Sequence, residues 1–164
     1  MHDAPRPPEA PSIRRRLALT RKQMLGLPLL AAVPVLALFG VFGERRADVR
    51  AASAAVEMLV RYPERFRYRQ IQPLDVTVRN ISQRAIDTLR VLLDTGYLSR
   101  FSSVRIDPAP GAAFVVTFTN VKPGESRLVS AELWGERYWS HRGRLVATAG
   151  ADSAAVEVRT LVFP

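Results

Sequence analysis

The stretch LDVTVRNISQRAIDTLRVLLD, residues 74–94, decides the fold of most of this chain. Apolar and polar side chains alternate along both of its halves, and a period of two is typical of strands with one buried face. The mostly polar stretch 80–83 between the halves predicts a turn. The side chains predicted to face inward are Leu74, Val76 and Val78 in the first strand and Leu89, Val91 and Leu93 in the second.

The same alternation extends from Pro63 to the C-terminus, with turn residues at intervals of about 8 to 15 positions. In residues 112–121 the predicted inward set is Phe114, Val116 and Phe118. Together these runs predict about seven or eight short strands in about a hundred residues. The fold expected for residues 63–164 is therefore mainly β, an Ig-like (immunoglobulin-like) antiparallel β-sandwich.

Two motifs carry a resemblance to a known group of domains. A V-x-V-x-N strand and turn is formed by Val76, Val78 and Asn80, and a Pro-Gly-Glu turn at 123–125 precedes the apolar run at 128–133. In these residues the chain resembles bacterial extracytoplasmic Ig-like or fibronectin-III-like domains. The resemblance implies the β-sandwich fold, and it implies no function, because one fold serves many functions.

Residues Met24 to Gly43 form twenty consecutive positions without a charged side chain. A helix of that length covers the roughly 30 Å hydrocarbon core of a bilayer, so an N-terminal transmembrane helix is expected at 24–43. A cleaved signal peptide is the alternative, but its apolar run is about 7 to 15 residues long. The basic residues before the segment predict a cytoplasmic N-terminus, with residues 63–164 on the periplasmic side of a bacterial inner membrane.

Two prolines, Pro28 and Pro34, lie inside the expected span, where each removes a backbone donor. Neighbouring helices can satisfy the carbonyl groups that this frees, so both prolines are candidate contacts with other membrane-protein subunits. The alternative is an ordinary anchor that tolerates them. The Pro-rich, basic arm at 1–23 is expected to be disordered at its start and to approach anionic lipid headgroups. Residues 44–62 are alanine-rich, which predicts a helical juxtamembrane linker.

Composition narrows the possible chemistry. The chain has 24 Lys and Arg against 15 Asp and Glu, two His and no Cys. Because His2 lies in the arm and His141 stands alone, the sequence offers no His pair for metal binding or for a catalytic base with its relay. We therefore expect no catalytic residue, no metal and no cofactor, and hence a protein that is not an enzyme.

The densest basic stretch is residues 61–69, RYPERFRYR. Strand alternation places Arg65, Arg67 and Arg69 on one face, with Phe66 and Tyr68 on the other. The structural interpretation is a solvated arginine face that protects a sheet edge. The functional interpretation is contact with lipid headgroups or with an acidic partner surface. Interleaved arginines and aromatics can also bind nucleic acid, but an extracytoplasmic location argues against such a partner.

A second cluster, residues 134–143, contains both tryptophans of the chain. Trp139 is the leading candidate for a partner contact, since exposed Trp and Tyr are enriched at interface hot spots. Trp134 and Tyr138 are expected to pack over the open end of the sandwich. The remaining contact candidates are His141 and Arg142 in this cluster, and Tyr97 and Phe101 in the segment TGYLSRFSSV.

Two classes of function fit these features. The first is a noncatalytic single-pass accessory subunit that stabilises a larger membrane protein complex, with respiratory or photosynthetic assemblies as plausible hosts. The second is a membrane-tethered adhesion or ligand-binding module. Recovery of stoichiometric membrane partners distinguishes the first class from the second.

Overall fold

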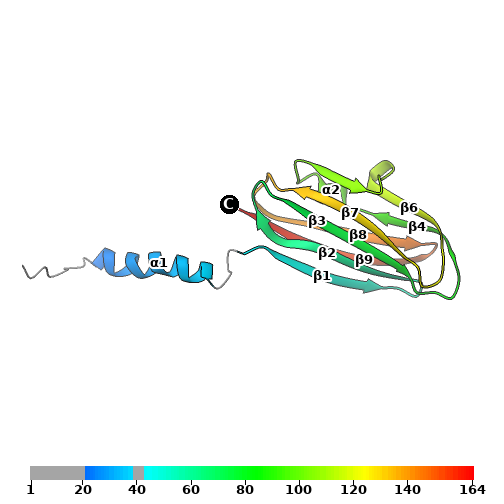
Figure 1. Ribbon diagram of the computed structural model, residues 1–164, viewed down its shortest axis with the longest axis horizontal. Helices are drawn as coiled ribbons and strands as arrows, with labels where there is room; N and C mark the ends of the chain where they lie inside the picture. Colours follow the sequence, from blue (N-terminus) through cyan, green and yellow to red (C-terminus); the bar gives the residue numbers. More distant parts are fainter. Residues whose placement is uncertain (1–20, 39–42) are drawn as a thin grey trace, which may run out of the picture. The chain divides into compact units, whose positions relative to one another are not determined.

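The computed structural model describes residues 21–38 and 43–164 of the chain (Figure 1). Contacts between residues divide the chain into two units, and the second, Gly43–Pro164, holds all the strands. We call this second unit the β-domain. Its first residue lies twenty positions before the boundary at residue 63 that the sequence predicts.

The described part of the first unit is one helix, α1 (Arg21–Leu38), and both Pro28 and Pro34 lie inside it. Within the described ranges, no helix has the combined length and apolarity needed to cross a membrane. Residues 39–42 of the expected span, and residues 1–20 of the expected arm, lie outside the described residues.

The β-domain is mainly β, as the alternating pattern predicts. Its nine strands are β1 (Arg45–Ala52), β2 (Val56–Arg67), β3 (Ile71–Asn80), β4 (Ile86–Leu92), β5 (Val104–Asp107), β6 (Val115–Val121), β7 (Ser126–Trp134), β8 (Trp139–Ala149) and β9 (Asp152–Phe163). A short helix, α2 (Thr95–Leu98), follows β4, and a 3-10 turn (Ala112–Phe114) precedes β6.

The strands form one hydrogen-bonded sheet that curls over at β2. The order is β5-β7-β3-β2-β9-β8-β4-β6, and β1 pairs with β2. The first half of β2 pairs antiparallel with β3, whereas its last three residues, Arg65–Arg67, pair parallel with Leu161–Phe163 of β9. Figure 1 shows the resulting layers, with β1, β2, β3 and β7 over β4, β6, β8 and β9. Such an arrangement is typical of Ig-like β domains.

The helical linker predicted for residues 44–62 is wrong. These residues form β1 and the first half of β2, with Val56, Met58 and Val60 fully buried in the core. Alanine-rich composition is a weak prior for a helix, and the burial of every second side chain from Val56 to Val60 outweighs it. The strand alternation predicted along residues 61–69 also ends early, at Arg67, because the chain turns between β2 and β3.

The predicted core is largely confirmed. Both sets of inward-facing residues in 74–94 are buried, and so is Val116. Phe118 packs only partly against the core, and Phe114 lies in the 3-10 turn at a φ of 54°, before the strand alternation begins. Asn80 of the V-x-V-x-N motif is buried, and its side-chain amide donates hydrogen bonds to the carbonyl oxygens of Val121 (2.9 Å) and Arg84 (2.8 Å).

Candidate interaction site

The pairing register gathers four separate segments at one end of the β-domain. Arg45, the first residue of β1, is opposite Arg65, which is opposite Leu161 near the end of β9. On the other side of β9, Val162 is opposite Trp139, the first residue of β8. We call this end the proximal end; it comprises the start of β1, the β2–β3 turn, the β7–β8 loop and the end of β9. Figure 1 shows β1 starting near the C-terminus.

Exposed aromatic side chains lie at the proximal end. Trp139 is 79% exposed, and its φ of 84° is a left-handed value that bulky residues rarely adopt. Tyr138 does pack, with its ring stacked on Tyr68 at a centroid distance of 4.7 Å, but part of it stays exposed. Trp134 is also partly exposed and lies opposite Ile71. Trp139 is therefore placed as a contact residue requires, and a strained, exposed position of this kind is a pointer to function.

The three arginines predicted to share one face of the 61–69 stretch, Arg65, Arg67 and Arg69, do not all lie on one strand. Arg65 and Arg67 flank the buried Phe66 in β2, as alternation predicts. Arg69 lies beyond the strand, in the β2–β3 turn, with a φ of 61°. Its guanidinium carbon lies 5.4 Å from the centroid of the Tyr68 ring, within the range of a cation–π contact. Arg67 and Arg69 are exposed at the proximal end, and Arg65 is half-buried.

Three predicted contact candidates are core residues instead. Tyr97, Phe101 and His141 are all buried. The Phe101 ring packs edge-on against Tyr97 (5.1 Å between centroids) and against His141 (5.6 Å). The segment after β4 folds inward because Asp94 caps α2, its carboxylate accepting a hydrogen bond from the Tyr97 N–H at 3.0 Å. These three side chains therefore pack in the core, although Tyr97 and His141 also line a hollow at the surface of the domain.

A buried hydrogen-bonded chain links Tyr97 to both layers. The Tyr97 hydroxyl lies 2.8 Å from the Thr160 hydroxyl, which donates to the Pro63 carbonyl oxygen at 2.8 Å. Burial raises the pKa of Tyr97 well above its usual value, although the Thr160 hydrogen bond opposes this shift. The phenol therefore keeps its proton in the folded domain at pH values where an unfolded chain releases it.

The stability of the β-domain should fall with a Tyr97-dependent slope above about pH 10, the pKa of an unfolded tyrosine. Below that pH both states are protonated, and above it only the unfolded state ionises, which costs roughly 1.4 kcal/mol per pH unit. Tyr97→Phe should remove this slope, and the partly exposed Tyr138→Phe should keep it. Urea unfolding at pH 8 and at higher pH values measures it. Equal slopes in the two variants would contradict the prediction.

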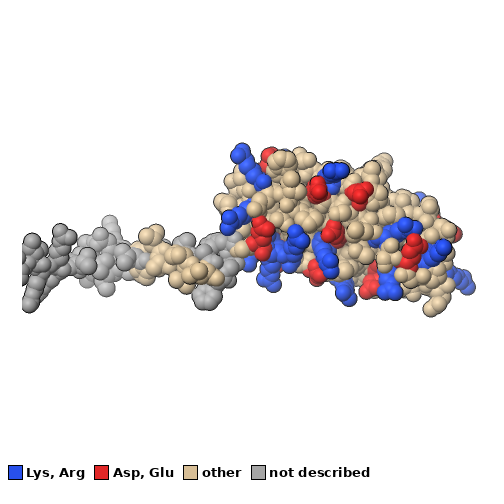
Figure 2. Space-filling model, in the orientation of Figure 1, with Lys and Arg blue, Asp and Glu red and all other residues tan. Residues whose placement is uncertain are grey.

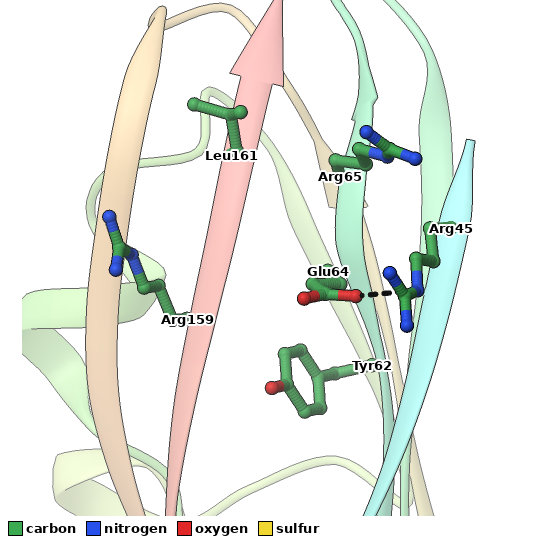
Figure 3. A pocket seen from close by; sticks show the side chains of 6 residues that line it. All are labelled: Arg45, Tyr62, Glu64, Arg65, Arg159 and Leu161. Carbon is green, nitrogen blue, oxygen red and sulfur yellow. Dashed lines mark ion pairs between the residues drawn. The ribbon is translucent and has the colours of Figure 1, made fainter. Parts of the chain in front are cut away.

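Hollows lined by arginines lie over the outer surface of β9. One, of about 460 Å³, is lined by Arg45, Tyr62, Glu64, Arg65, Arg159 and Leu161. Figure 3 shows Tyr62 and Glu64 reaching from β2 toward β9, with Glu64 paired to Arg45 at 3.0 Å. A second hollow, of about 750 Å³, is lined by Arg159 together with Arg142, one of the predicted contact candidates. Over the face that Figure 2 shows, basic and acidic side chains are otherwise interspersed.

The exposed aromatic rings and arginines of the β-domain are side chains suited to binding a partner or an anion. In the ranges 21–38 and 43–164, no three His, Asp or Glu side chains lie close enough together to hold a metal ion. Exposed aromatic rings suit protein or membrane interfaces, and arginines suit oxyanions. Sequence reasoning missed Ser140, which lies two positions before Arg142 in β8. It also missed Arg159 and Arg100, which join Arg142 through the register of β8 with β9 and the fold of the segment after α2.

Several solved structures resemble part of this chain at low sequence identity. The CARDB domain of the PF1109 protein from Pyrococcus furiosus, in complex with di-metal ions, is 12% identical with a TM-score of 0.44, covering 69% of this chain and 94% of that one. BslA, a bacterial hydrophobin, is 8% identical with a TM-score of 0.40, covering 66% and 99%. The ASH/PapD-like domain of human CEP192 is 7% identical with a TM-score of 0.35, covering 67% and 84%. No family model and no curated protein matches the sequence.

Proposed function

We propose that this protein is a noncatalytic, single-pass accessory subunit that stabilises a larger membrane protein complex, such as a respiratory or photosynthetic assembly. In this proposal the segment 24–43 anchors the chain in a bacterial inner membrane, with the N-terminus in the cytoplasm. The β-domain then contacts the partner on the extracytoplasmic side. The observation that carries the proposal is Trp139, which is strained and 79% exposed beside other aromatic side chains.

The anchor rests on the uncharged stretch 24–43 and on the basic residues before it. The chain enters the β-domain at the proximal end, where Arg45 begins β1. An anchored chain would thus carry its exposed aromatics on the part of the domain where the anchor is attached. Partner subunits in the same membrane, and lipid headgroups near the basic arm, are the surfaces that such an end would meet.

Trp139→Ala should reduce the recovery of partner subunits by roughly 30-fold, the equivalent of losing a hot spot of about 2 kcal/mol. Trp139→Gly should reduce it equally while leaving the free energy of unfolding unchanged or raised, since glycine adopts a φ of 84° without strain. Purification of the full chain in mild detergent, followed by quantitative mass spectrometry, measures recovery. Leu128→Ala is the matched control, because Leu128 is 54% exposed but belongs to β7 away from the proximal end.

Two outcomes would oppose this proposal. If the wild-type chain is recovered alone, it has no stoichiometric partner and is not an accessory subunit. If Leu128→Ala and Trp139→Ala lose partners equally, the proximal end is not the contact surface. Pro28→Leu and Pro34→Leu test the helix separately, since they should weaken recovery while the β-domain stays folded.

The arginine-lined hollows favour one alternative, a membrane-tethered adhesion or ligand-binding module. This alternative expects a chain that is recovered without membrane partners and that captures a soluble anionic ligand. The same detergent purification distinguishes the two functions, because the accessory role needs partners of defined stoichiometry.

A further inference from the structure

Two pairs of arginines lie directly opposite each other across strand ladders. Arg45 faces Arg65 between β1 and β2, and Arg142 faces Arg159 between β8 and β9. Like charges at opposed positions of an antiparallel ladder repel and destabilise the sheet. Each pair therefore needs a counter-charge, and the two pairs differ in whether the protein supplies one.

The first pair has a counter-ion within the protein. Glu64 accepts an ion pair from Arg45 at 3.0 Å. For Arg142 and Arg159, no carboxylate of residues 43–164 lies within ion-pair distance. Asp94 lines the same hollow, but its two oxygens accept hydrogen bonds from the backbone N–H groups of Tyr97 and Arg144, each at 3.0 Å. The second pair thus lacks a charge partner in the described part of the chain.

A third arginine and a hydroxyl complete this hollow of about 750 Å³, which we call the arginine hollow. Arg100, just after α2, lines it together with Arg142 and Arg159, and all three are exposed. Ser140 accepts a hydrogen bond from Arg159 Nε at 2.9 Å. This bond orients the Arg159 guanidinium and leaves its two terminal nitrogens available as donors.

We propose that the arginine hollow binds a phosphate group, carried by a lipid headgroup or by a soluble phosphate. A planar carboxylate is matched by the parallel donors of one guanidinium. Here the arginines come from three elements, β8, β9 and the segment after α2, so a tetrahedral anion with several acceptor oxygens suits them better. The bound anion supplies the counter-charge that Glu64 gives to the first pair.

The first experiment titrates inorganic phosphate into the full chain in a neutral detergent, at an ionic strength held constant with chloride. Wild type should bind phosphate, and its thermal midpoint should rise as phosphate is added. Arg142→Gln and Arg159→Gln should each raise the dissociation constant for phosphate at least about tenfold. Arg90→Gln is the control: Arg90 is exposed on β4 and faces Thr117 and Thr148, so its loss should change nothing.

A second readout separates this site from a merely structural arginine cluster. Without phosphate and at low salt, Arg142→Gln should raise the thermal midpoint, because it removes the repulsion with Arg159. A structural arginine would lower the midpoint when removed. The proposal is overturned if wild type does not bind phosphate, or if binding survives both substitutions. It is also overturned if Arg142→Gln lowers the thermal midpoint in the absence of phosphate.

The source of the phosphate is tested with the full chain in vesicles of phosphatidylcholine, with or without added phosphatidylglycerol. If a lipid is the source, phosphatidylglycerol alone should raise the midpoint of wild type, and inorganic phosphate should then add nothing. If the source is soluble, the response to inorganic phosphate should be the same in both vesicles. In either case Arg142→Gln should need at least about tenfold more of the phosphate source for the same response. A response equal to that of wild type contradicts the assignment.

Discussion

Replacing Gly143 with valine is expected to destabilise the β-domain strongly. A Cβ placed on Gly143 would overlap the Cβ of Tyr97 and lie 2.6 Å from its Cγ, which real side chains essentially never do. Tyr97 cannot retreat, because Asp94 holds its N–H and Thr160 holds its hydroxyl. Overpacking of a core usually costs about 1–3 kcal/mol. With Tyr97 held at both ends we expect at least about 3 kcal/mol, a large part of a typical domain stability of about 5–15 kcal/mol.

Trp134 and Trp139, both in the β-domain, make intrinsic fluorescence a direct measure of its unfolding. In urea, Gly143→Ala should already shift the midpoint downward, and Gly143→Val should shift it further. Gly111→Ala is the matched control, because a Cβ there would make an ordinary 3.5 Å contact with the Val115 carbonyl oxygen. A Gly143→Ala midpoint equal to that of Gly111→Ala would show that Tyr97 is free to move.

Where the sequence predicted the fold well, the information was local. The alternation in residues 74–94 depends only on neighbouring positions, and its six inward residues are all buried. Where it failed, the deciding contact was distant in the chain. Residues 44–62 read as helix from composition, but Arg45–Ala52 pairs with β2 as a strand. A capping signal was available for α2 in Asp94, whose carboxylate accepts from the third residue after it.

In the candidate site, too, local features were predicted correctly and features that depend on distant contacts were missed. Trp139 was predicted as a contact because a tryptophan between turn residues is locally conspicuous, and the structure shows that its side chain is exposed. The burial of Tyr97, Phe101 and His141 was missed because it depends on contacts between distant segments. Gly143 leaves room for the Tyr97 side chain, and Phe101 packs against Tyr97 and His141. The opposition of Arg142 and Arg159 depends on the register of β8 with β9, which composition and spacing do not specify.

Substitution of Phe66 by alanine should cost about 3–5 kcal/mol, the usual range for removing a fully buried phenylalanine. Phe66 lies in the three-residue parallel ladder that joins β2 to β9, opposite Val162. Its ring stacks on Phe101 at 6.4 Å and fills the space above Gly135, where an added Cβ would lie 2.6 Å from the ring. Alanine would leave a cavity at the point where the curled sheet closes.

The consequence of Phe66→Ala should reach the proximal end, because Val162 also pairs with Trp139. We therefore expect a lower urea midpoint together with weaker partner recovery. Leu161→Ala is the matched control in the same ladder: Leu161 is 39% exposed, so its loss should cost about 1 kcal/mol or less. If Phe66→Ala lowers the midpoint no more than Leu161→Ala, then the parallel ladder, rather than the Phe66 ring, holds β2 against β9.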